Sequence, residues 1–156
     1  MNINFYKGNA NAVRSQLASV IREKFDPTKI VGIKQHEDKN SFILLNPVKG
    51  KAPYLTLMLK GFNQSNRSKD SVLLDYTFEI EVYDEYKELL GSKPAITYGL
   101  IDAVLKIVYN SQGDLSNDIF KVYYVDIVKV TFDKDISPGN TRWMGLAEFS
   151  LTVGFA

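Results

Sequence analysis

Residues 72–83, VLLDYTFEIEVY, carry the clearest pattern in the chain and decide its fold class. Apolar and polar side chains alternate there, and successive side chains of a β-strand point to opposite faces of a sheet. The stretch is therefore expected to be a strand with a core side and a solvent side. The core side carries Tyr76, Phe78, Ile80 and Val82, and the solvent side carries Asp75, Thr77, Glu79 and Glu81.

Further strands are expected on both sides of this one. Residues 30–34, 41–45 and 54–62 precede it, and residues 119–132 and 142–155 close the chain. The turn residues 135–140, DISPGN, predict that the last two strands form an antiparallel hairpin. One face of the first is expected to carry Phe120, Val122, Tyr124, Val128, Val130 and Phe132. One face of the second is expected to carry Trp143, Gly145, Ala147, Phe149, Leu151, Val153 and Phe155.

Asp126 interrupts the apolar face expected in residues 119–132. A buried carboxylate without a partner is costly, because the charge loses its hydration. We therefore expect Asp126 to lie at a bulge or a strand end, or to be hydrogen-bonded. A structural role is the favoured interpretation.

Two helices are expected. In residues 10–25, Val13, Leu17, Ile21 and Phe25 recur every four residues, and Asp26 and Pro27 end the pattern. Residues 95–110 follow Pro94, end before Gly113 and carry a wide apolar face that is expected to cover a sheet. The order α-β-β-β-β-α-β-β predicts an α+β fold, with both helices packed on a mainly antiparallel sheet.

The bulk composition predicts one globular domain, residues 1–156, with 45% hydrophobic and 24% charged residues. No apolar run reaches the roughly 18 residues that a membrane span needs, and the first residues lack the layout of a signal peptide. The chain is therefore expected to fold where it is made. Its formal net charge of +1 gives no overall basic field for nucleic acid.

The sequence shows no pattern of a catalytic, cofactor or metal site. It has no cysteine, which excludes thiolate catalysis and cysteine-bound metals, and its one histidine, His36, lies in a charged turn. No phosphate-binding, dinucleotide, nucleophile-elbow or zinc-protease motif is present. Glu79, Glu81 and Asp75 could divide acid and base roles, but the solvent side of a strand is the favoured interpretation. We expect a protein that is not an enzyme.

The polar loops are the expected sites of contact with partners. Residues 46–53 (NPVKGKAP) and 63–71 (NQSNRSKDS) carry basic side chains that could meet phosphates or an acidic protein surface. The apolar side chains in residues 1–9 predict that this arm docks on its own domain or on a neighbour. The candidate partner contacts are Lys49, Lys51, Arg67 and Lys69 in the loops, and Asp75, Glu79 and Glu81 on the strand.

In the order, length and residue pattern of these segments, the chain resembles the tail terminator proteins of long-tailed bacteriophages, the group that includes the tail terminator of phage lambda. The segments that carry the resemblance are NPVKGKAPYLTLML (46–59), DYTFEIEVYD (75–84), ITYGLIDAVLKIVYNS (96–111) and the two long C-terminal strands. A short N-terminal amphipathic helix precedes them, and the resemblance extends over nearly the whole chain.

The resemblance implies a structural virion protein that assembles in the host cytoplasm. Such proteins form a hexameric ring on the last ring of tail tube subunits, stop its polymerisation and meet head-completion or neck proteins. DNA passes through the channel without specific binding. The acidic row Asp75, Glu79 and Glu81 could face a neighbour or line this channel. Two alternatives remain open: a neck or head-completion protein, and a small module that binds a ligand or nucleic acid.

Overall fold

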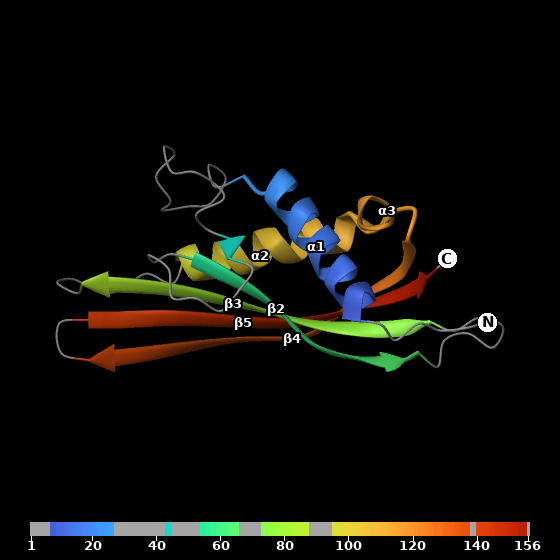
Figure 1. The fold of residues 1–156 in the computed structure, drawn as a ribbon. Helices are drawn as coiled ribbons and strands as arrows, with labels where there is room; N and C mark the ends of the chain where they lie inside the picture. Colours follow the sequence, from blue (N-terminus) through green and yellow to red (C-terminus); the bar gives the residue numbers. More distant parts are fainter. Residues whose placement is uncertain are drawn as a thin grey trace.

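The computed structural model describes residues 7–26, 43–44, 54–65, 73–87, 95–137 and 140–155. In this part of the chain, helices cover one face of a five-stranded sheet (Figure 1). The elements are α1 (Lys7–Lys24), β1 (Ile43–Leu44), β2 (Tyr54–Gln64), β3 (Leu74–Lys87), α2 (Ala95–Asn110), α3 (Gln112–Leu115), β4 (Phe120–Ser137) and β5 (Asn140–Phe155).

The strand order in the sheet is β1-β2-β3-β5-β4. The strand β1 runs parallel to β2, and every other neighbouring pair is antiparallel. The predicted α+β class with a mainly antiparallel sheet is therefore confirmed. The helix predicted at 95–110 has the observed bounds, whereas α1 begins three residues before the predicted start, at Lys7.

Several predicted boundaries differ from those observed. The strand predicted at 30–34 and residues 1–6 of the predicted arm lie outside the described residues. The short helix α3 was not predicted, since four residues carry too little periodicity to recognise. The last two strands form the predicted antiparallel hairpin. They continue into the segment predicted as their connection, through Ser137 and from Asn140, so the predicted connection, residues 135–140, was too long.

The core lies between the helices and the central strands β3 and β5. Phe78 of β3 pairs with Phe149 of β5, and their rings stack with centroids 5.7 Å apart. Each such side chain contributes about 1.5–3 kcal/mol when fully buried. The alternation predicted for residues 75–82 is confirmed, because the members of its core side are all buried. These are Tyr76, Phe78, Ile80 and Val82.

The helices α1 and α3 hold each other by polar contacts at the edge of this core. The Lys24 ammonium of α1 lies 2.5 Å from the Asp114 carboxylate of α3 and 3.1 Å from the Ser111 hydroxyl. The Gln16 amide donates a hydrogen bond to the Asp114 carbonyl. Because Lys24 and Asp114 are both more than one third exposed, solvent screens the ion pair. The contact orients α1 more than it stabilises the fold.

Gly145 of β5 sets how closely α2 approaches the sheet. A β-carbon at this position would lie 2.5 Å from Cδ1 of Ile101 and 3.0 Å from Cγ2 of Thr97. Both of these side chains belong to α2 and are buried, so neither has free space to move into. The missing side chain therefore lets the helix lie directly on the strand.

We expect Gly145→Ala to lower the free energy of unfolding by about 1–3 kcal/mol, because the added methyl overpacks the contact with α2. Urea unfolding followed by circular dichroism measures this. Gly61→Ala is the matched control, since a β-carbon there meets no atom within 4 Å. An equal effect of the two substitutions would contradict the close approach of α2.

The strand β4 contains two β-bulges that change which side chains face the helices. Val122 pairs with Val153 and Tyr124 with Thr152, so Tyr123 is an extra residue. Val128 is a second extra residue, between the pairs formed by Ile127 and Lys129. Each bulge shifts the alternation of the strand by one residue. The face towards the helices therefore consists of Phe120, Val122, Val125, Ile127, Val130 and Phe132.

The predicted even-numbered apolar face, interrupted by Asp126, was wrong in the middle of the strand, at Tyr124 and at the extra residue Val128. Tyr124 and Asp126 pair with Thr152 and Ser150, on the side of the sheet away from the helices. Asp126 lies between the two bulges and is half-buried. It therefore does not interrupt the core face, because the bulges turn it to the other side.

Tyr76 is a buried phenol in the core, and its ring lies against Phe62 and Phe155. Burial raises the pKa of its hydroxyl above the usual value of about 10, because the ionised form loses hydration. Below pH 10 the folded and unfolded chains both keep the proton. Above it the unfolded chain ionises first, so the stability contributed by this group falls as the pH rises through its raised pKa.

We expect Tyr76→Phe to make the unfolding free energy less sensitive to pH above about pH 10 than it is in the wild type. Chemical unfolding at a series of alkaline pH values gives the slope for each variant. Tyr109→Phe is the control, because Tyr109 is 61% exposed. A slope that is unchanged in Tyr76→Phe would show that other groups cause the alkaline loss.

Candidate functional site

The face of the sheet away from the helices is the candidate functional site. In Figure 1 all three labelled helices lie on one side of the strands, and among the described residues no helix lies on the other. We call that other side the open face. Its described side chains come from four strands, and they include Thr56 and Met58 of β2, Asp75, Thr77, Glu79 and Glu81 of β3, Met144, Leu146, Glu148, Ser150 and Thr152 of β5, and Tyr124, Asp126, Lys129, Thr131 and Asp133 of β4.

A row of charges crosses the middle of the open face. Glu79 pairs with Glu148 on the neighbouring strand, and Glu148 pairs with Lys129 on the next. Like charges directly opposite each other destabilise a sheet. The Lys60 ammonium offsets this repulsion, since it lies 3.6 Å from a carboxylate oxygen of Glu79 and 3.6 Å from one of Glu148.

Lys60 reaches this position because it is the extra residue of a bulge in β2. Leu59 pairs with Phe78 and Gly61 with Thr77, which leaves Lys60 unpaired in the ladder. The bulge lets a basic side chain bridge two strands while its apolar neighbours keep their place on the core face. The three side chains are partly exposed, so each ion pair contributes at most about 1 kcal/mol.

Asp75 is anchored rather than free on this face. The Thr152 hydroxyl of β5 donates a hydrogen bond to its carboxylate at 2.5 Å. Thr152 is fully buried, so this hydroxyl has no water to replace its partner. Hydrogen bonds to charged groups contribute about 1.5–3 kcal/mol when desolvated. Asp75 therefore joins β3 to β5 as a structural contact.

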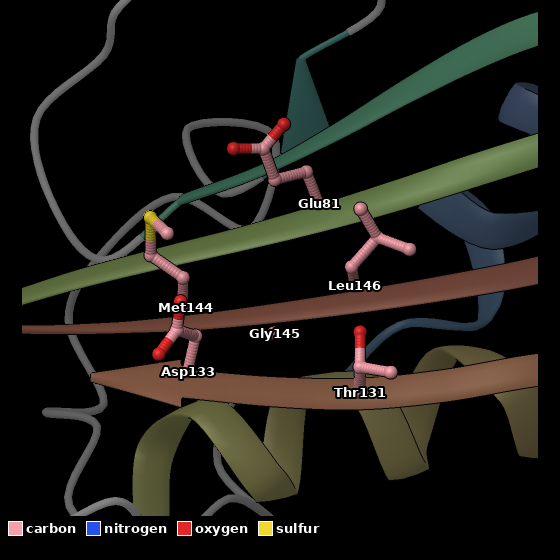
Figure 2. A pocket seen from close by; sticks show the side chains of 6 residues that line it. All are labelled: Glu81, Thr131, Asp133, Met144, Gly145 and Leu146. Atoms are coloured by element: carbon pink, nitrogen blue, oxygen red, sulfur yellow. The ribbon is translucent and has the colours of Figure 1, made fainter. Parts of the chain in front are cut away.

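Glu81 lies at a shallow depression on the open face. Figure 2 shows the side chains around it, which project from β3, β4 and β5. The depression has a volume of about 220 Å³, below the roughly 300–1,000 Å³ of typical small-molecule sites. Its volume is small for a whole ligand. It is lined by Glu81, Thr131, Asp133, Met144, Gly145 and Leu146.

The predicted contact residues divide into two groups. Asp75, Glu79 and Glu81 lie on the open face, as the alternation predicted. Lys49, Lys51, Arg67, Lys69 and His36 lie outside the described residues.

The charged members of the site that the sequence prediction missed include Glu148, Asp133, Lys60 and Lys129. Alternation along residues 142–152 places Glu148 opposite the core side chains and was a usable signal. Its meeting with Glu79 depends on strand register. The position of Lys60 depends on a bulge that no local pattern announces.

The exposed apolar side chains of the sheet gather on β4, at one edge, and on β2, next to the short strand β1 at the other. On β4 they are Tyr123, Tyr124, Ile127, Val128, Val130 and Phe132, and on β2 they are Met58 and Phe62. Among the described side chains, β3 and β5 contribute no exposed large apolar residue. The ring of Phe132 meets Tyr98 of α2 edge-on at 4.6 Å, which extends the apolar surface of β4 towards the helix. Exposed apolar strand edges are typical of assembly surfaces.

Within the described part of the chain, no group of three acidic or histidine side chains lies close enough to hold a metal ion. None of the described helices has the length and hydropathy to cross a membrane. Comparison of the sequence with protein-family models gives no match, and comparison with curated proteins gives none either.

We expect Thr152→Val to lower the free energy of unfolding by about 1–3 kcal/mol, because the Asp75 carboxylate loses its buried donor. Thr97→Val is the matched control. Thr97 is also fully buried, but in the described structure its hydroxyl has no hydrogen-bond partner. Removing that hydroxyl is expected to be neutral or to stabilise the protein by up to about 1 kcal/mol. Equal losses in the two variants would contradict the structural role of Asp75.

Proposed function

We propose that this chain is a structural protein of a phage virion, a tail terminator that forms a ring on the end of the tail tube. Its main support is the outer strand β4, which is 18 residues long and carries exposed apolar side chains along much of its length. A monomer with such an edge is prone to unwanted pairing. In an assembled particle the same edge becomes a buried contact.

The proposed role needs contacts between polypeptides and no catalytic centre. The partners are other copies of the chain, in a hexameric ring, together with the tail tube protein on one side and a head-completion or neck protein on the other. The ring resides in the virion and is assembled in the host cytoplasm. An enzymatic activity is not part of the proposal.

The charge of the open face fits a surface past which DNA moves. Its described acidic side chains, Asp75, Glu79, Glu81, Asp126, Asp133 and Glu148, outnumber the basic ones, Lys60, Lys121, Lys129 and Arg142. Phosphate-binding surfaces show the opposite balance, because cations must replace the counterions of the DNA. An open face that lines the channel would therefore let DNA pass without retaining it.

Mass measurement of the purified protein, alone and mixed with tail tubes, tests the proposal. We expect a ring on the tube end and shorter tubes when the protein is present during polymerisation. Binding to filled heads and not to tubes would favour a neck or head-completion protein. A monomer that ignores tubes and binds DNA in a salt-sensitive way would favour a nucleic-acid module.

Val128→Lys is expected to weaken capping of tail tubes by about tenfold or more, which corresponds to 1.4 kcal/mol. Val128 is 59% exposed at a bulge of the outer strand β4, and a lysine on an edge strand opposes pairing. Tyr109→Lys is the control, since Tyr109 is equally exposed but lies on α2. Thermal unfolding should be similar for both, as neither side chain is in the core. Equal capping by the two variants would count against the β4 edge.

A further inference from the structure

We propose that neighbouring copies join edge to edge, with β4 of one copy paired to β2 of the next, so that one sheet continues around the ring. This inference rests on the proposed ring and names the contact that closes it. A ring needs two different patches on each subunit, one fitting the other. The exposed apolar side chains of the sheet lie on two such patches, β4 and β2.

The second patch is the outer edge of β2. The strand β1 pairs with β2 only at Leu55 and Thr56. From residue 57 to residue 64, no described strand pairs with the outer side of β2. This stretch spans about 27 Å at roughly 3.4 Å per residue. Met58 and Phe62 expose about two fifths of their surface there.

The directions of the strands suit this pairing. Since β2, β3, β5 and β4 are antiparallel in turn, β2 and β4 run in opposite directions. A rotation about an axis along the strands keeps the direction of every strand. The β4 strand of the next copy would therefore lie antiparallel to β2, the more stable of the two arrangements per residue.

The side chains at the two edges also match. Residues that pair with one another across the strands form a row of the sheet. A rotation about the same axis leaves each row at the same height along that axis. Within one copy, Leu57 shares a row with Val130, Leu59 with Ile127 and Phe62 with Val125, and all of these side chains lie on the helix side. At the joint the same rows bring apolar side chains together. A slip of one residue would place them against the polar side chains of the open face.

Side chains of opposite charge on the open face also come together at the proposed contact between β2 and β4. Gly61 shares a row with Asp126, and the bulge places Lys60 beside Gly61. The next copy therefore brings the Asp126 carboxylate beside the Lys60 ammonium. Opposite charges across neighbouring strands favour this register over its alternatives. The polarity of the side chains, the direction of the strands and the charges at the contact all favour the same occupant for the β2 edge, a second copy of this chain.

A cysteine-free chain allows a direct test by disulfide trapping. Met58 and Lys129 share a row on the open face, so Met58→Cys and Lys129→Cys meet across the proposed joint. Opposed residues of an antiparallel pair have α-carbons about 4.5–5.5 Å apart, which suits a disulfide. Oxidation of the double variant, concentrated in solution and bound to tail tubes, should give a ladder of linked oligomers on a non-reducing gel.

Two controls define the contact. The double variant Tyr109→Cys, Lys129→Cys moves one thiol from the β2 edge to α2, and should give at least about tenfold less linked product. The double variant Met58→Cys, Thr131→Cys tests a register shifted by two residues, and should also link poorly. Efficient linking in either control would overturn the proposed register.

Two other results would overturn the inference and leave the proposed function standing. Efficient dimers of the single variant Lys129→Cys would show that β4 pairs with β4 of a second copy about a two-fold axis. Normal capping of tubes without linking in the Met58→Cys, Lys129→Cys variant would place the subunit contact elsewhere. If the wild type caps no tubes, the proposed function fails. In that case the ladder formed in concentrated solution still shows whether the β2 and β4 edges meet.

Discussion

The alternation of β3 and β5 under a single layer of helices is the constraint on which the rest of the structure depends. Because the described helices cover only one face of these strands, every second side chain is buried in the core and the others face away from it. Gly145 lets α2 lie close enough to seal the covered side. The charges of the open face are a consequence of the same alternation. One pattern thus builds the core and the candidate contact surface together.

The parts of the fold that follow one strong period could be predicted from the sequence. The alternation of residues 75–82 and the wide apolar face of residues 95–110 identified β3 and α2, along with the acidic row of Asp75, Glu79 and Glu81. The partners of that row could not be predicted. Glu148 meets Glu79 through strand register, and Lys60 reaches both through a bulge. Register and bulges arise from pairing between distant segments.

The middle of β4 shows how the period itself can mislead. Val122, Val125, Ile127 and Val130 all face the helices, yet their residue numbers change from even to odd and back to even along the strand. A strict period of two assigns either all the even-numbered or all the odd-numbered residues to one face. The even-numbered choice assigns Tyr124 and Asp126 to the core. A carboxylate within an otherwise apolar face was the local sign that the parity had changed. The bulges at Tyr123 and Val128 are its physical cause.

The pair of bulges also bears on how the length of this strand can vary during evolution. Tyr123 and Val128 are extra residues, while the residues on either side of them pair with consecutive residues of β5. Loss of either one would remove its bulge and leave every other residue with the same partner and on the same face. Loss of a paired residue such as Val125 would instead move the side chains on one side of it to the wrong face. Homologous chains that are shorter in this strand are therefore expected to lack Tyr123, Val128 or both.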